Sequence, residues 1–140
     1  MIGKARPRSG FLHLSGYKYT MPQSLPVSAS LNSNTLLVVV TTLPNAGAAK
    51  EMAYSLVEKK LAACVQLMGD IQSIYPWEGK ICEEQEVLLS AKTTDSKWLE
   101  ILSFIQSTHP YDLPEIMAFS PEQFESQYGK WVESEVNSKA

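Results

Sequence analysis

The side chains best suited to chemistry lie together in an eight-residue segment that runs from His109 to Ile116. An imidazole and a phenol, His109 and Tyr111, stand on either side of Pro110, and a second proline follows at Pro114. Because proline cannot continue a helix and restricts the residue before it, this segment is expected to be a stiff turn between a helix and a strand. A histidine held on such a turn can ligate a metal, or its ring can pack and hydrogen-bond across an interface.

Three further positions are candidates for binding a ligand. Glu86 and Lys92 are six residues apart in an expected strand, so their side chains share one face and can line a polar cleft with Tyr111. The structural alternative is that both form ion pairs between subunits. Trp77 lies in an expected hairpin, where an aromatic ring can stack on a planar ligand but more often anchors a protein interface.

The remaining nucleophilic and basic side chains do not form a catalytic set. His13 and His109 are the only histidines, and the sequence has no glycine-rich phosphate loop. We therefore predict no enzymatic reaction and no required cofactor. Cys64 and Cys82 lack the spacing of a disulfide scaffold or a zinc site, and two free thiols of this kind indicate a reducing, cytoplasmic compartment.

Charge is distributed unevenly along the 140 residues. The chain has 12 basic and 15 acidic side chains and 44% hydrophobic residues, an ordinary composition for one globular domain. Four of the basic residues and none of the acids fall in residues 1–34, so residues 35–140 carry a net charge of −7. An acidic body repels phosphate backbones and anionic lipid, which argues against binding to nucleic acid or to a membrane.

Residues 1–34 are expected to be an extension outside a single folded domain that spans residues 35–140. Proline, serine, glycine and asparagine are frequent there, and hydrophobic periodicity is absent. The basic, acid-free composition is partly that of an organelle transit peptide, although no arginine-rich amphipathic helix is evident. An expression leader or tag, or a start codon upstream of a true start at Met21, explains the segment equally well.

Hydrophobic periodicity predicts four strands in the remaining residues. These strands are residues 35–42, 62–77, 80–93 and 115–119. The second and third form a long hairpin, with its turn at Glu78 and Gly79 and a weak break near Gly69 and Asp70. The first strand is a run of β-branched and apolar residues, which is typical of a central strand that is buried on both faces.

Three helices are expected between and after these strands. Asn45 is a good N-cap for the first helix, and Asp95 or Ser96 can cap the second. Ser120 and Pro121 resemble a cap followed by a proline at the first helical position, which predicts the start of the third. A glycine in the middle of this last helix weakens it, so a start at residue 124 or later is the alternative.

The order strand, helix, strand, strand, helix, strand is that of the split β-α-β, or ferredoxin-like, group of α+β folds. Such a fold has a four-stranded antiparallel sheet with both crossover helices on one face. Here an extended hairpin and a C-terminal helix are added to it. Strands as apolar as residues 36–40 should not face water, so we expect an oligomer that covers the other face of the sheet.

The chain also resembles the CutA family of divalent-cation tolerance proteins over residues 36–136. Each matching segment is weak alone, but their order and spacing together are specific. The segments are Leu61 to Val65; Ser73, Ile74 and Tyr75 with Trp77 and Gly79; Glu86 with Lys92 and Thr93; His109, Pro110 and Tyr111 with Pro114, Glu115 and Ile116; and Tyr128 with Trp131.

The resemblance implies a ferredoxin-like subunit that assembles as a stable homotrimer, similar to the nitrogen-regulatory trimeric signal proteins. It implies a part in tolerance to copper and other divalent cations, with no catalytic reaction securely attached. Animal members of the family are associated with the anchoring or maturation of acetylcholinesterase.

The ligands described for copper in this family are only partly present in the chain. They are a cysteine at the end of the first strand and two adjacent histidines, and these positions correspond here to Thr41, Thr108 and His109. His109 is therefore the one candidate metal contact that the resemblance supplies. A single imidazole in each subunit needs further donors, because tight transition-metal binding takes three or more.

Two functions follow from these observations. The first is a cytoplasmic homotrimer that binds divalent metal ions, copper in particular, and takes part in metal tolerance. The second is a trimeric scaffold or small-molecule signalling module whose clefts are lined by Glu86, Lys92 and Tyr111, with an indirect effect on metals.

Overall fold

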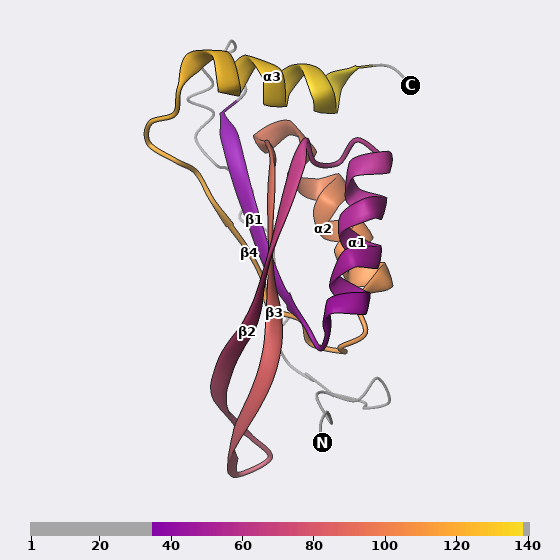
Figure 1. Cartoon of the computed structure of the whole chain (residues 1–140), viewed down its shortest axis with the longest axis vertical. Helices are drawn as coiled ribbons and strands as arrows, with labels where there is room; N and C mark the ends of the chain where they lie inside the picture. The colour runs from indigo at the N-terminus through magenta and orange to yellow at the C-terminus, as the bar shows by residue number, and fades with distance from the viewer. Residues whose placement is uncertain (1–34, 139–140) are drawn as a thin grey trace, which may run out of the picture.

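The computed structural model describes residues 35–138, which form one four-stranded antiparallel sheet and three α-helices (Figure 1). In chain order the elements are β1 (Leu36–Leu43), α1 (Ala46–Glu58), β2 (Cys64–Trp77), β3 (Lys80–Thr94), a 3₁₀ turn (Asp95–Lys97), α2 (Trp98–Thr108), β4 (Ile116–Phe119) and α3 (Ser126–Asn137). The predicted order of strands and helices is confirmed. The extension expected at residues 1–34 lies outside the described residues.

The sheet has the strand order β2-β3-β1-β4, with every neighbouring pair antiparallel. β3 is therefore inserted between β1 and β2, as the split β-α-β arrangement requires. Both α1 and α2 lie on the same side of the sheet in Figure 1. Among the described residues, no helix is long and apolar enough to cross a membrane.

The hydrophobic core lies between this sheet and the two crossover helices. α1 contributes Ala49, Met52 and Leu56, whose spacing of three and four residues places them on one helical face. α2 contributes Ile101 and Ile105, which are fully buried. The strands contribute alternate residues, which are Leu37, Val39, Leu43, Val87, Leu89 and Ala91.

The two crossover helices begin in different ways. The Asn45 side chain accepts a hydrogen bond from the backbone N–H of Ala48 at 2.8 Å, so the predicted cap of α1 is confirmed. The predicted cap of α2 is wrong. Asp95–Lys97 form a 3₁₀ turn, and α2 starts at Trp98 without a side-chain cap. The Ser96 hydroxyl lies 2.8 Å from that of Thr94 instead.

The predicted start of α3 at Ser120 is also wrong, and the alternative of a start after residue 124 is confirmed. α3 begins at Ser126, and the Glu125 carboxylate accepts the backbone N–H groups of Gln127 at 3.0 Å and Tyr128 at 2.7 Å. These hydrogen bonds favour the ionised carboxylate, so they lower the pKa of Glu125 below its ordinary value.

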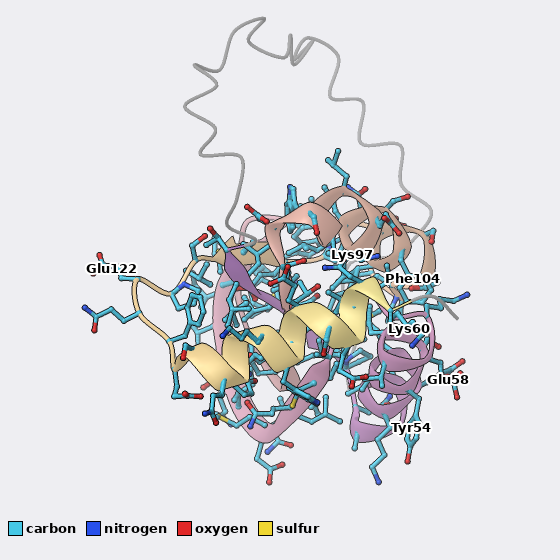
Figure 2. All side chains as sticks on the ribbon, turned by 90° about the horizontal axis from the view of Figure 1, so that it is seen from above. Tyr54, Glu58, Lys60, Lys97, Phe104 and Glu122 are labelled. Carbon is cyan, nitrogen blue, oxygen red and sulfur yellow. The ribbon has the colours of Figure 1, made fainter. Side chains whose placement is uncertain are left out.

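α3 lies across one end of the sheet (Figures 1 and 2). Its side chains Val132 and Val136 are buried. The residue that follows α3 contacts the segment after α1, because the Lys60 ammonium donates a hydrogen bond to the Ser138 hydroxyl at 2.7 Å.

The β2–β3 hairpin extends beyond the rest of the described chain at the opposite end (Figure 1). Its two-residue turn has positive φ at both positions, 49° at Glu78 and 78° at Gly79, which is the conformation that matches the twist of a tight hairpin. The expected break near Gly69 is a shift of register between Met68 and Ile71. Asp70, with φ of 57°, absorbs this bulge.

The face of the sheet opposite α1 and α2 carries a row of apolar side chains. We call it the open face and define it by Val38 and Val40 of β1, Met117 and Phe119 of β4, and Met68 of β2. The registers of β1 with β3 and β4 place these residues opposite to the core side. Phe119 is 55% exposed, Met117 44% and Met68 62%, so a large apolar surface meets solvent in the single chain.

We predict that the effect of Gly129→Ala depends on Phe124. A Cβ at buried Gly129 would lie 2.3 Å from the Phe124 ring, so the ring must move away. With Phe124 present the substitution should destabilise α3, whereas in a Phe124→Ala background it should stabilise it by about 1 kcal/mol through helix propensity. Urea denaturation of the four proteins of this double-mutant cycle measures the coupling. Equal effects in both backgrounds would contradict the prediction.

Candidate functional site: a buried histidine and its neighbours

The His109 ring is fully buried immediately after the last residue of α2. Its Nδ1 accepts the backbone N–H of Tyr111 at 3.1 Å, which assigns the ring proton to Nε2 in the neutral form. Nε2 lies 2.9 Å from the carbonyl oxygen of Thr42 and 3.1 Å from the hydroxyl of Thr41. The N–H group at Nε2 therefore donates to β1, and both ring nitrogens are engaged.

This geometry sets a condition for the metal contact expected at His109. A metal binds a nitrogen lone pair, but Nδ1 already accepts a hydrogen bond and Nε2 carries the proton. A cation can bind here only if it displaces the N–H group of Tyr111 or the bonds to β1. Within residues 35–138, no cluster of three histidine, cysteine, aspartate or glutamate side chains is arranged to hold a metal ion.

The two threonines that the resemblance places at the other expected ligand positions have different surroundings. Thr41 lies against the His109 ring, although 68 residues separate them in the sequence. Thr108 is exposed, and its hydroxyl donates a hydrogen bond to the carbonyl of Phe104 at 2.8 Å, within its own helix. The structure thus brings Thr41 and His109 together and leaves Thr108 exposed and apart from them, at the end of α2.

Glu86 and Tyr111 lie together, as the sequence predicts. The Tyr111 hydroxyl donates to the Glu86 carboxylate at 2.8 Å, and both residues are at least 95% buried. The rings of His109 and Tyr111 are 4.9 Å apart between centroids. A continuous chain of contacts therefore joins the end of β1, the turn after α2 and the middle of β3.

Lys92 and Trp77 are not part of this cluster. The Lys92 ammonium donates to the side chains of Gln66 at 2.6 Å and Ser90 at 3.1 Å. Six residues of strand separate it from Glu86, which corresponds to roughly 20 Å. Trp77 lies opposite Lys80 beside the hairpin turn. Within one described chain, the expected cleft shared by Glu86, Lys92 and Tyr111 is therefore not formed.

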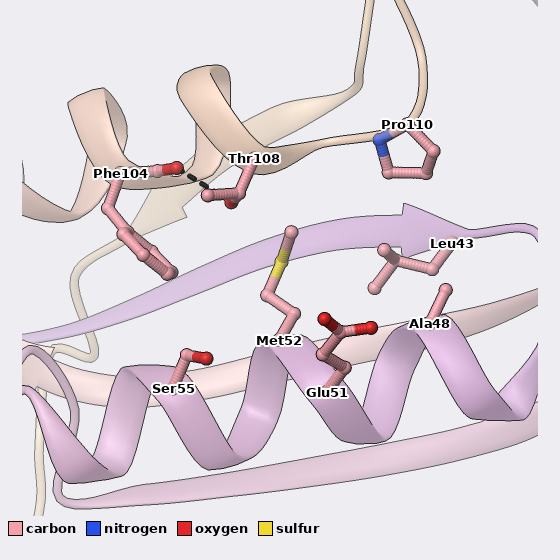
Figure 3. Close-up of a pocket in the computed structure, with 8 residues that line it drawn as sticks. All are labelled: Leu43, Ala48, Glu51, Met52, Ser55, Phe104, Thr108 and Pro110. Atoms are coloured by element: carbon pink, nitrogen blue, oxygen red, sulfur yellow. Dashed lines mark hydrogen bonds between the residues drawn. The ribbon is translucent and has the colours of Figure 1, made fainter.

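A cavity that the sequence did not predict lies between α1 and α2 (Figure 3). It has a volume of about 210 Å³. Its lining comes from residues 43–55 and 104–110, two stretches that lie far apart in the sequence, so no local pattern could have revealed it. The lining residues are Leu43, Ala48, Glu51, Met52, Ser55, Phe104, Thr108 and Pro110.

Together, the split β-α-β sheet, the long hairpin and the turn that buries His109 define a small, single-sheet α+β protein with an uncovered apolar face. The family model described as "CutA1 divalent ion tolerance protein" matches residues 37–135. The chain therefore belongs to the CutA1 divalent ion tolerance family.

Individual relatives agree with this assignment. The chain is 40% identical to Protein CutA of Homo sapiens over 127 residues, which cover 90% of this chain and 71% of that protein. It is 38% identical to the divalent-cation tolerance protein CutA of Thermus thermophilus over 95 residues, covering 68% and 92% of the two chains. The structure of CutA1 from Oryza sativa matches with a TM-score of 0.72 and 35% identity, over 76% of this chain and all of that one.

Proposed function

We propose that this chain takes part in divalent-cation tolerance as a cytoplasmic homotrimer that binds copper or another divalent cation. Membership of the family and the printed name of the Thermus thermophilus relative support the role in cation tolerance. No reaction is part of the proposal.

The open face is the observation that supports the proposed trimer. Phe119 and Met117 of β4 lie beside Val38 and Val40 of β1, and both β4 side chains are more than 40% exposed in the single chain. Contact between subunits removes this apolar surface from water, at about 25 cal/mol for each Å² that is buried. In a closed ring of three subunits, each open face can be covered by its neighbours.

His109 remains the proposed contact for the cation, although binding has a cost there. The incoming ion must replace at least one of the buried hydrogen bonds to Thr42 or Tyr111. We therefore propose that donors from a neighbouring subunit complete the site, because one imidazole is too few for tight binding.

Titration of the metal-stripped protein with Cu(II), beside a parallel Zn(II) titration, tests this proposal, and light scattering gives the mass. We expect three chains in each particle and saturable Cu(II) binding that weakens at least tenfold in His109→Gln. Glutamine can keep a donor near the Nε2 position but cannot replace the imidazole lone pair. Cys82→Ser serves as the control for adventitious binding to a thiol, and it should bind like the parent.

Two results would contradict separate parts of the proposal. A monomeric particle would contradict the proposed trimer. A stable trimer with weak, non-stoichiometric Cu(II) binding would contradict the proposed metal site and favour the scaffold or signalling function.

A further inference from the structure

The cavity between α1 and α2 has apolar walls and a polar rim. Met52 of α1, Phe104 of α2 and Leu43 at the end of β1 supply apolar surface, and Pro110 closes one end (Figure 3). The cavity is on the helical side of the sheet, opposite the open face, so assembly through the open face leaves it accessible.

One carboxylate stands at this cavity. Glu51 rises from α1 on the same side as Met52, toward α2 (Figure 3). Among residues 35–138, no hydrogen-bond or ion-pair partner neutralises it. The hydroxyl of Ser55, one turn further along α1, also lines the cavity and can accept or donate a hydrogen bond.

A second source of negative potential faces the same space. α2 ends at Thr108, which lines the cavity, so the C-terminal end of that helix lies beside it. The dipole of a helix is negative at this end and favours a cation there. The N-terminal end of α1 is positive and opposes this effect, because Ala48 in its first turn also lines the cavity. The Glu51 carboxylate is therefore the feature that favours a cation.

We propose that this cavity binds a small organic ammonium ion, a primary amine with an apolar body of about one aromatic ring. The body fills the space between Met52 and Phe104, and the ammonium group donates hydrogen bonds to Glu51 and Ser55. A bare metal ion does not suit the site, because a single carboxylate beside apolar walls offers too few donors. An inorganic anion does not suit it either, because the Glu51 carboxylate would repel it at the cavity. The Lys59 ammonium lies 5.7 Å from the centroid of the Phe104 ring, so a bound ammonium ion must sit on the Glu51 side of the cavity.

Amide NMR spectra of the full chain, titrated with 2-phenylethylammonium, test the proposal directly. The neutral analogue 2-phenylethanol has the same apolar body without the charge. We expect saturable shifts at Ala48, Glu51, Ser55 and Thr108, with the ammonium binding about fivefold more tightly than the alcohol.

Matched variants separate the contribution of the Glu51 charge to binding from that of the cavity's shape. Glu51→Gln should reduce ammonium binding to the level of the alcohol, and Glu58→Gln, an acid on the same helix that does not line the cavity, should leave it unchanged. Ala48→Leu should weaken both probes, because the larger side chain fills the cavity.

Three results would overturn the inference: equal affinity for the ammonium ion and the alcohol, equal effects of the two glutamate variants, or no saturable shift at the lining residues. None of them bears on trimer formation or on copper binding, which are measured separately.

Discussion

Replacing His109 with alanine is expected to lower the free energy of unfolding by about 3 kcal/mol or more, a large part of the stability of a domain of this size. The substitution leaves a cavity in the position of a fully buried ring. It also leaves the carbonyl of Thr42 and the N–H group of Tyr111 without their partners. Urea denaturation at matched protein concentration measures the change.

Two conservative variants divide this effect between the two sides of the ring. Asparagine can place an acceptor near the Nδ1 position, toward Tyr111, whereas glutamine can place a donor near the Nε2 position, toward Thr42. Each should recover part of the loss. If His109→Ala abolished Cu(II) binding but left stability within about 0.5 kcal/mol of the parent, the ring would be a metal ligand with little structural role.

Placing a charge on the open face is expected to dissociate the proposed trimer. Phe119→Asp replaces an apolar ring on β4 with a carboxylate, at a position that pairs with Val38 in the neighbouring strand. Burial of a phenylalanine contributes about 2 kcal/mol in each subunit, and burial of an unpaired carboxylate is unfavourable by more than that. Light scattering should therefore report a mass that falls from three chains to one.

The matched control places the same charge on the other side of the molecule. Leu99 of α2 is 72% exposed, so Leu99→Asp also removes an exposed apolar side chain in favour of a carboxylate. Its mass should equal that of the parent. A fall in mass for both variants, or for neither, would show that the open face is not the contact between subunits.

The sequence predicted those parts of the fold that depend on local patterns. The alternating and apolar strands, the cap at Asn45 and the turn at Glu78 and Gly79 each follow from residues that are close in the sequence. The first of the two predicted starts of α3 was wrong because Ser120 and Pro121 satisfy a local helix signal that the tertiary structure overrides. Residues 120–125 connect the end of β4 to the start of α3. An extended chain advances about 3.3 Å for each residue and a helix only about 1.5 Å, so these residues must be extended to span the connection.

The candidate site was predictable only in part, for a similar reason. The proline turn identified His109 and Tyr111, and the strand pattern identified Glu86. The contacts of the His109 ring with Thr41 and Thr42 join residues that are 68 and 67 positions apart, which no local spacing can reveal. Alternation correctly placed Lys92 on the same strand and the same face as Glu86. It does not take account of the distance along the strand, so it wrongly predicted that the two side chains share a cleft.

The central position of β1 has a consequence for folding order. β1 is the first described element of the chain, yet its partners β3 and β4 come after it, and Leu36 pairs with Thr94 while Val38 pairs with Phe119. During synthesis, β2 and β3 can close their hairpin locally, whereas β1 keeps an unpaired apolar edge until β4 has been made. The nascent chain is therefore most prone to aggregation before residue 119 emerges, and pairing of β4 with β1 is the step that ends this exposure.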